Sequence, residues 1–364
     1  MLLRNEGALP LNRTQVRRLA VIGPWADSVY LGGYAGTPRR AISVLQGLRA
    51  KLGDAVRVDS ALGANITASK PNVAKDAGFE YELPTPADEP ENARLTVEAV
   101  AAARESDAII LCVGDNNSTA GESWAGRITR DRAELGLVGG QQALYDAVAK
   151  LGVPVIVLVF SGRPMALTGV NGAAALIQCW ALGQETGTAI ADMLFGDVSP
   201  GGKLPVSLPR TVGQLPIYYD YRPSGRRNYL FESAAPLYPF GHGLNYSRFE
   251  MVGPPSLERT QINIGDNTTV HVDIKNAGDR RADEVVQLYV HAPVSSVTRP
   301  IKELAGFERI TLNPGERRNV TFILEPEHFS FVGRDMKRVI EPGDFEISVG
   351  FNSGELTSTR LTLE

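Results

Sequence analysis

The sequence has few of the features that mark specialised classes of protein. It contains only two cysteines and four scattered histidines, which argues against a disulfide-rich scaffold and against a metal-ligand cluster. It has no stretch of about 18 uncharged apolar residues, so no membrane-spanning helix is expected. It has no basic run, and its formal net charge of −4 gives no attraction to nucleic acid or to an anionic membrane. We predict no metal ion, cofactor, nucleic-acid partner or membrane partner.

The two cysteines, Cys112 and Cys179, both lie within apolar runs. This placement favours buried, reduced thiols. A disulfide between them is the alternative, but their spacing gives it no support.

The N-terminal residues 1–11 do not form a signal peptide, because they lack a long apolar core and a small-residue cleavage site. We expect them to be the last turn of a helix that ends at Gly7 and Pro10. A chain that begins at the end of a helix suggests that a segment upstream is missing. The protein would be cytoplasmic as it stands, and periplasmic or secreted if it is a fragment of a longer precursor.

A chain of 364 residues is long enough for two domains, and its 43% hydrophobic and 21% charged residues are typical of globular proteins. Residues 1–210 are predicted to form an α/β domain with a mostly parallel sheet between helices. The prediction rests on apolar, strand-like runs that alternate with helical periodicity. The expected strands are 18–23, 56–59, 107–113, 153–160 and 174–181, and the expected helices are 43–52, 91–105, 140–150 and 185–195. Residues 64–90 show little periodicity and are expected to be a loop or an insertion.

Residues 211–250 are rich in Pro, Tyr and Gly and are predicted to be a linker. From residue 251 to residue 364 the helical periodicity disappears. Short alternating runs, such as 268–275, are separated by turn signals, such as Asn313-Pro-Gly-Glu316, and this pattern predicts an all-β sandwich.

The candidate functional residue is Glu122. It lies in the loop after the expected strand 107–113, and ligands bind at the carboxyl ends of the strands in open α/β sheets. Trp124 and Arg127 lie beside it in the sequence. A carboxylate in such a place can donate a proton, but most acid/base hydrolysis needs a second carboxylate, and the sequence offers no convincing one.

Several segments form a specific combination when taken together. They include Leu3-Arg-Asn-Glu-Gly-Ala-Leu-Pro-Leu11, Val159-Phe-Ser-Gly-Arg-Pro-Met-Ala-Leu167, Gly201-Gly-Lys-Leu-Pro-Val206 and Leu237-Tyr-Pro-Phe-Gly-His-Gly-Leu-Asn-Tyr246. Through them the chain resembles the C-terminal half of bacterial family 3 glycoside hydrolases, the β-glucosidase and β-xylosidase family. The resemblance implies an α/β sandwich domain followed by a fibronectin type III-like domain.

The resemblance also implies that the (β/α) barrel of the family is absent. In the family, the barrel carries the nucleophilic aspartate and a Lys-His pair that grips the sugar, and this sequence has no Lys-His pair and no Asp directly before a Trp. The family places its general acid/base on a glutamate in a sandwich-domain loop, and Glu122 matches that position. Family loops often place an Arg four residues after this Glu, whereas Arg127 follows five residues later.

Each of the other residues in or near this loop has a functional and a structural interpretation. Trp124 is either a platform for a sugar or a packing residue, and Arg127 binds substrate or pairs with Asp131 or Glu122, of which we favour the ion pair. Asp115, Asn116 and Asn117 could bind sugar hydroxyls, although turn formation explains them better. Arg163 follows the strongest predicted strand, and we expect a structural role for it.

The leading hypothesis is a β-glucosidase-like hydrolase, acting on terminal β-glycosidic bonds with retention, represented by the domains that supply the acid/base but not the nucleophile. Its partners would be a β-linked glucoside or oligosaccharide, and a separate barrel domain or further copies of the chain. Alone, the chain is expected to be inactive. The alternative is a non-catalytic carbohydrate-binding or scaffold protein. A nucleotide-binding, flavodoxin-like protein is a weaker reading, because the loop Gly32–Gly36 lacks the context of a phosphate loop.

Overall fold

The computed structural model describes most of the chain as two compact units. The described residues are 1–32, 35–68, 72–76, 79–121, 123, 131–225 and 228–364. Unit 1 contains Met1–Val198 and Pro209–Leu215, and unit 2 contains Ser199–Leu208 and Pro216–Glu364. In this division most of the predicted linker, residues 216–250, groups with unit 2.

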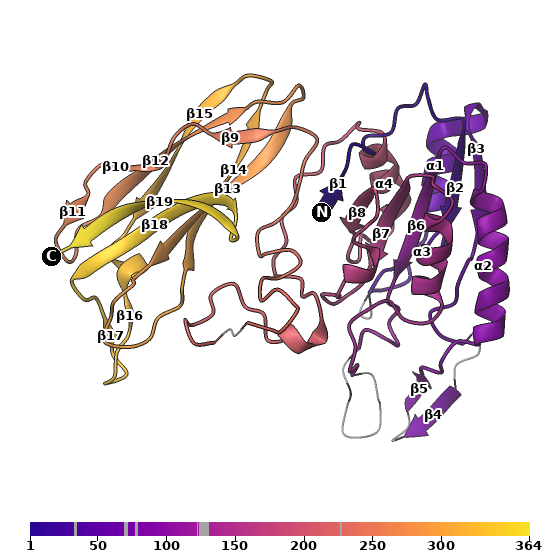
Figure 1. Cartoon of the computed structure of the whole chain (residues 1–364), viewed down its shortest axis with the longest axis horizontal. Coiled ribbons are helices and arrows are strands. Elements are labelled where there is room, and N and C mark those ends of the chain that lie inside the picture. Colours follow the sequence, from indigo (N-terminus) through magenta and orange to yellow (C-terminus); the bar gives the residue numbers. More distant parts are fainter. Residues whose placement is uncertain (33–34, 69–71, 77–78, 122, 124–130, 226–227) are drawn as a thin grey trace. The chain divides into compact units, whose positions relative to one another are not determined.

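A six-stranded sheet forms the centre of unit 1, in the order β1-β8-β7-β6-β2-β3 (Figure 1). The strands are β1 (Leu2–Asn5), β2 (Arg18–Ile22), β3 (Arg57–Ala61), β6 (Ala108–Gly114), β7 (Val155–Phe160) and β8 (Ala175–Gln178). Every neighbouring pair is parallel except β1 with β8. All residues of β6 and β7 are buried, as expected for apolar strands covered on both faces.

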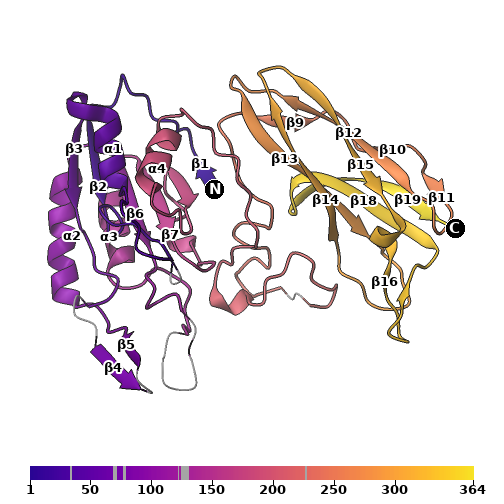
Figure 2. The same cartoon turned by 180° about the vertical axis from the view of Figure 1, so that it is seen from behind.

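In the part of the chain that the structure describes, four α-helices cover the two faces of this sheet. They are α1 (Val44–Leu52), α2 (Glu89–Ala103), α3 (Gln141–Ala149) and α4 (Thr186–Leu194). The connection from β2 to β3 moves in one direction along the sheet, and the connections from β3 through β6 and β7 to β8 move in the other. Because such crossovers are right-handed, α1 lies on one face and α2 and α3 on the opposite face, as the front and back views show (Figures 1 and 2).

The helix α4 packs against α1 through two glycines. A Cβ atom on Gly47 of α1 would lie 2.2 Å from the carbonyl carbon of Gly187 in α4, so the two backbones approach too closely for any side chain there. The start of α1 is fixed by Ser43, whose hydroxyl accepts from the backbone N–H of Gln46 while the Gln46 side chain accepts from the Ser43 N–H. The helix predicted from residue 43 is thereby confirmed.

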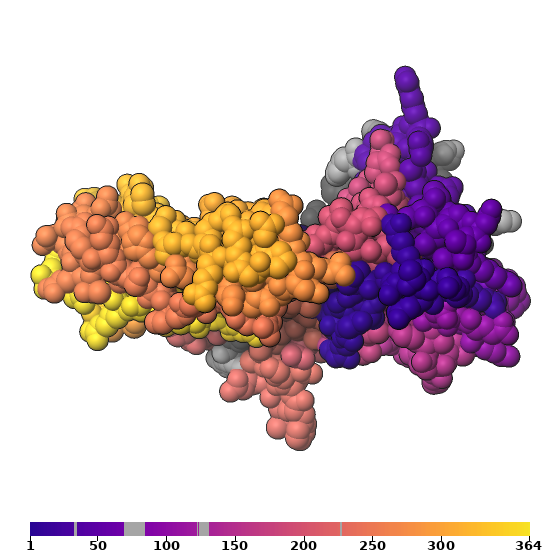
Figure 3. Space-filling view, turned by 90° about the horizontal axis from the view of Figure 1, so that it is seen from above, coloured from indigo at the N-terminus to yellow at the C-terminus, as the bar shows by residue number. Residues whose placement is uncertain are grey.

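One prediction about unit 1 is wrong. Residues 1–11 were expected to end a helix, but Leu2–Asn5 forms the edge strand β1, whose fully buried Leu2 pairs with Ile177 of β8. Residues 64–90 are expected to be a loop or an insertion, and within them β4 (Asn72–Asp76) and β5 (Phe79–Leu83) form a separate hairpin between β3 and α2. After β1 the chain is exposed from Asn12 to Gln15, and this part of the chain, in the darkest indigo, is visible at the surface in Figure 3.

Both cysteines are buried free thiols, as expected. Cys112 lies in β6 and Cys179 directly follows β8, with β7 between these strands. Two strand spacings amount to roughly 10 Å, which is beyond the reach of a disulfide. Among the described residues, no helix combines the length and the apolar character needed to cross a membrane.

Unit 2 is built around two mainly antiparallel sheets that form a β-sandwich. This confirms the prediction of an all-β sandwich after residue 251. One sheet contains β9 (Phe249–Met251), β10 (Ser256–Leu257), β12 (Thr268–Asn276) and β15 (Arg317–Leu324). The other contains β11 (Gln261–Ile262), β13 (Ala282–His291), β14 (Glu303–Leu312), β18 (Gly343–Asn352) and β19 (Glu355–Leu363). A small pair, β16 (Phe331–Val332) and β17 (Arg338–Val339), lies outside these sheets. Val270, Val272 and Ile274 point from β12 into the shared core.

The segments 199–208 and 237–246 are held in unit 2 by a buried ion pair. Lys203 lies 2.6 Å from Glu284 of β13, and only 12% and 7% of these side chains are exposed. Lys203 also donates to the carbonyl of Gly243, and Asn245 donates to Glu284. Burial raises the pKa of Glu284, and the Lys203 ammonium offsets part of the shift. Two of the segments that carry the resemblance to family 3, 201–206 and 237–246, therefore meet at this buried ion pair.

Candidate functional site

The candidate site lies where the direction of the sheet connections reverses. β2 and β6 are neighbours, but the chain leaves β2 towards β3 on one side and leaves β6 towards β7 on the other. Ligands in open α/β folds bind outside the carboxyl ends of the strands at such a switch point. The loop after β6, which contains Glu122, begins there.

The three residues predicted to act at this site, Glu122, Trp124 and Arg127, lie outside the described residues. Their described neighbours fix the ends of the segment that contains them. The side chain of Arg163 donates from Nη2 to the carbonyl of Gly121 at 2.8 Å. The backbone N–H of Ser123 donates to Asp131 Oδ1 at 3.2 Å, and the backbone N–H of Asp131 donates to Ser123 Oγ at 3.0 Å.

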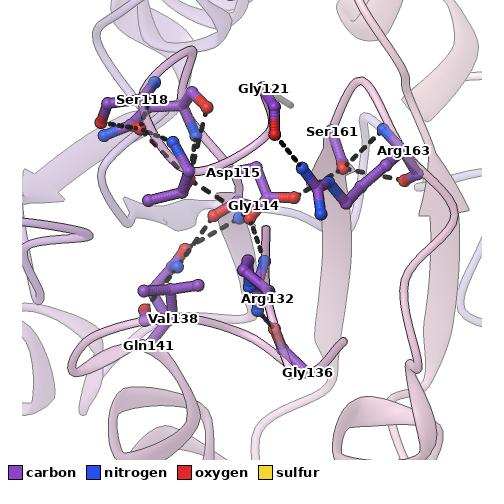
Figure 4. Close-up of polar contacts among 12 residues, drawn as sticks. Gly114, Asp115, Ser118, Gly121, Arg132, Gly136, Val138, Gln141, Ser161 and Arg163 are labelled. Atoms are coloured by element: carbon purple, nitrogen blue, oxygen red, sulfur yellow. Dashed lines mark hydrogen bonds and ion pairs between the residues drawn. The ribbon is translucent and has the colours of Figure 1, made fainter. Parts of the chain in front are cut away.

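The centre of the described site is Asp115, the first residue after β6. It is 0% exposed, and its Oδ1 atom lies 2.7 Å from Nη1 of Arg132 (Figure 4). The hydroxyl of Ser161, directly after β7, donates to Oδ2 at 3.0 Å. Asp115 therefore joins the loops that follow β6 and β7, and its role is to position the loops. The sequence favours turn formation for Asp115, but its carboxylate is held in a buried ion pair instead.

Burial raises the pKa of the Asp115 carboxyl above its usual value, and the charge of Arg132 and the hydrogen bond from Ser161 offset part of that rise. Burial also lowers the pKa of Arg132, which the charge of Asp115 offsets in part. The Arg132 guanidinium makes a further hydrogen bond to the carbonyl of Gly136. The two charges thus compensate each other inside the domain, where an unpaired charge would be costly.

The end of β6 is fixed by Gln141, a fully buried residue at the start of α3. Its Oε1 atom accepts from the N–H of Gly114, and its Nε2 atom donates to the carbonyl of Gly114, both at 2.8 Å (Figure 4). Gly114 has φ +143°, and a Cβ atom there would lie 1.7 Å from the carbonyl oxygen of Phe160. Only glycine fits where the chain turns out of the sheet into the Glu122 loop.

The next residue, Asn116, forms the turn that was predicted for it. Its Oδ1 atom accepts from the backbone N–H groups of Ser118 and Thr119, each at 3.0 Å. The loop after β2 also contributes to the site, because Trp25 donates from its indole Nε1 to the carbonyl of Asp115 at 3.0 Å. Tyr30 packs edge-on against Trp25, with ring centroids 5.2 Å apart. Trp25 and Tyr30 were not identified from the sequence.

Arg163 has the structural role that the sequence suggested. Its backbone N–H donates to Ser161 Oγ at 3.1 Å, so the residue is held to the same network as Asp115. Its Nε group is buried and has no hydrogen-bond partner among the described residues. Also within the described part of the chain, no group of three His, Cys, Asp or Glu side chains could hold a metal ion.

Replacing Arg163 with methionine should loosen the loop that precedes Glu122. The variant loses a hydrogen bond from a charged donor to Gly121, an interaction worth about 1.5–3 kcal/mol. We expect faster amide hydrogen exchange across residues 116–121, measured by mass spectrometry, with the sheet strands unchanged. Arg104→Met, at an exposed position after α2, is the control. Equal protection of the loop in Arg163→Met and the unmodified chain would show that Arg163 does not hold it.

Comparison with known proteins identifies both parts of the chain. Residues 1–246 match the model of the glycosyl hydrolase family 3 C-terminal domain, and residues 284–353 match the fibronectin type III-like domain. The chain is 39% identical to a β-xylosidase of Formosa agariphila, covering 100% of this chain and 48% of the relative. It is 36% identical to a periplasmic β-glucosidase of Salmonella typhimurium, covering 98% of this chain and 47% of the relative.

Solved structures give the same result. The β-glucosidase EmGH1 from Erythrobacter marinus superposes with a TM-score of 0.92 at 43% identity, covering 100% of this chain and 49% of that one. A β-glucosidase from Listeria innocua in complex with glucose superposes with a TM-score of 0.84 at 31% identity, covering 100% and 48%. The chain thus spans about half the length of the relatives that it matches.

Proposed function

The chain belongs to glycosyl hydrolase family 3, and from this premise we propose that it supplies the general acid/base of a retaining β-glycosidase, with Glu122 in that role. The nucleophile would come from a barrel domain that lies outside this sequence. The observation that carries the proposal is the position of the Glu122 loop. It starts at the switch point of the sheet and is held there by Asp115, Arg163 and Gln141.

The proposed chemistry needs two carboxyl groups about 5–5.5 Å apart. The nucleophile attacks the anomeric carbon while Glu122 gives its proton to the leaving glycosidic oxygen. Glu122 then takes a proton from the water that releases the sugar from the covalent intermediate. A general acid/base contributes roughly 10²–10⁴-fold, which is far below typical enzymatic accelerations. The chain without a barrel is therefore expected to be inactive.

The described residues that flank Glu122 support the proposal because they hold the start of its loop in place. Rate acceleration by a proton donor depends on holding it within hydrogen-bond reach of the leaving oxygen. Trp124 is proposed to contact the substrate, as its place beside Glu122 in the sequence suggests. For Arg127, substrate contact is the alternative to the ion pair favoured above.

Reassembly of the two halves tests the proposed function. The part of the Formosa agariphila β-xylosidase that this chain does not match would be expressed separately and mixed with the chain. We expect release of 4-nitrophenol from its β-glucoside or β-xyloside in the mixture, with neither half active alone. Size-exclusion chromatography would establish that the halves form a complex. A complex without turnover of either glycoside would refute the proposal, and sugar binding by that complex would then favour the non-catalytic alternative.

A further inference from the structure

A cavity of about 800 Å³ opens in unit 1 beside the candidate site. Its walls come from residues after β3, residues after β5, the first turns of α2, the start of α3, and Thr119 of the Glu122 loop. The cavity therefore lies at the carboxyl edge of the sheet, where both helices begin. Its volume falls in the range of pockets that bind small organic molecules.

The lining of this cavity is mostly apolar and nearly uncharged. Ile66, Pro84, Pro86, Ala93 and Ala143 supply apolar surface. Four threonines and Asn92 supply hydroxyl and amide groups, and Glu89 is the only charged residue among the described lining residues. Because Glu89 is exposed, it faces solvent as well as the cavity. Such a surface suits an uncharged, flat or apolar ligand with few polar substituents.

The cavity wall is rigidly built where α2 meets α3. The backbone N–H of Asn65 donates to Asn92 Oδ1 at 2.7 Å. A Cβ atom on Gly140, the residue before α3, would lie 2.7 Å from the Asn92 side chain, and Gly139 has φ +66°. The glycine pair lets the chain before α3 lie close to the Asn92 side chain and to the backbone of Asn65 and Ile66, which fixes this part of the cavity wall.

The cavity is joined to the candidate site through Asn116. Its side-chain Nδ2 donates to the hydroxyl of Thr67 at 3.3 Å, and its backbone N–H donates to the hydroxyl of Thr119 at 3.0 Å. Both threonines line the cavity. The Thr119 hydroxyl also lies 3.4 Å from Asp115 Oδ1. Thr119, in the loop segment that leads to Glu122, therefore forms part of the cavity wall.

We propose that this cavity binds the aglycone of the substrate, an apolar, ring-containing leaving group. The inference rests on the proposed function, because an acid/base on the Glu122 loop protonates the bond between sugar and aglycone. A sugar is covered with hydroxyl groups and needs charged and polar partners, which this lining offers sparsely. An aryl ring needs apolar walls, which the lining offers, and one or two hydroxyl partners such as Thr67 and Thr119.

The test uses direct binding of a free aglycone, 2-naphthol, to the chain without any barrel. Calorimetry should detect binding to the unmodified chain. Ala93→Leu and Ala143→Leu fill the cavity from exposed helix positions and should each weaken binding at least tenfold. Ala101→Leu and Ala149→Leu are matched controls on the same two helices, exposed and outside the cavity lining, and should change binding less than twofold. Alanine and leucine both favour helix, so all four variants should fold.

The outcomes separate this inference from the proposed function. No binding of 2-naphthol, or equal weakening by the control variants, would overturn the aglycone site even if the reassembled halves hydrolyse glycosides. Cavity-dependent binding, together with halves that form a complex but are inactive, would support the cavity as a ligand site and refute the proposed function instead. In an active reassembled enzyme, Ala93→Leu should raise KM for a naphthyl glycoside and leave the affinity for glucose unchanged.

Discussion

Replacing Glu122 with glutamine should lower kcat/KM of the reassembled enzyme about 10²–10⁴-fold for a glycoside with a poor leaving group. Glutamine keeps the size of the side chain but cannot donate a proton to the glycosidic oxygen or accept one from water. The loss should shrink for a dinitrophenyl glycoside, because that leaving group departs without protonation. Initial rates with both substrates measure the effect.

Azide gives an independent readout for the same variant. With Glu122→Gln, the covalent intermediate lacks a base to activate water, so an anionic nucleophile that needs no base should restore turnover and yield a glycosyl azide. Glu134→Gln is the matched control, since Glu134 is an exposed carboxylate further along the same connection, and its activity should not change. Full activity of Glu122→Gln would show that another residue is the acid/base. So would the absence of azide rescue in Glu122→Gln if Glu134→Gln is impaired.

The elements that the sequence predicted correctly are those whose signal is local. The runs that form β6 and β7 are apolar on both faces, which is typical of buried parallel strands, and Ser43 with Gln46 marks the start of α1. The hairpin of β4 and β5 had a readable signal that we missed. Phe79-Glu-Tyr-Glu-Leu83 alternates strictly between apolar and acidic residues, a strand pattern. The sequence of β1 has no such strand pattern, because its two leucines fit the end of a helix equally well. Only the pairing with β8 makes this segment a strand.

The position of the loop after β6 could be predicted from the sequence, but the contacts that hold this loop could not. The loop after β6 could be placed at the sheet edge because strand order follows from the alternation of strands and helices. The partners of Asp115 could not be predicted, because Arg132 and Ser161 lie 17 and 46 residues away in the sequence. The roles of Glu122, Trp124 and Arg127 stay predictions, which the experiments above address.

Replacing Asp115 with alanine should destabilise unit 1 by about 3–5 kcal/mol. The change leaves the guanidinium of Arg132, whose side chain is 15% exposed, without its ionic partner, and removes one of the two acceptors near the Ser161 hydroxyl. Urea denaturation followed by circular dichroism would measure the loss, with the helix signal reporting mainly on unit 1. Glu98→Ala is the control, because it breaks an exposed ion pair with Arg94 on α2 and should cost less than about 0.5 kcal/mol.

A second variant separates lost charge pairing from lost packing. In Asp115→Asn/Arg132→Met both charges are gone, so the double variant should be more stable than Asp115→Ala if the unpaired guanidinium is the main cost. Equal destabilisation in both would place the cost in packing around the loop instead.

The pH dependence of the same pair follows from the raised pKa of Asp115. Because burial raises the folded-state pKa above that of the unfolded chain, the folded protein binds this proton more tightly. The part of the stability that comes from tighter binding of this proton is therefore fully present below the unfolded pKa, about 3.9, and is lost as the pH rises through the folded-state pKa. Asp115→Asn lacks this titration, so the stability of the unmodified chain relative to Asp115→Asn should fall across that window. A relative stability that rises there would mean that the charge of Arg132 outweighs burial at this site.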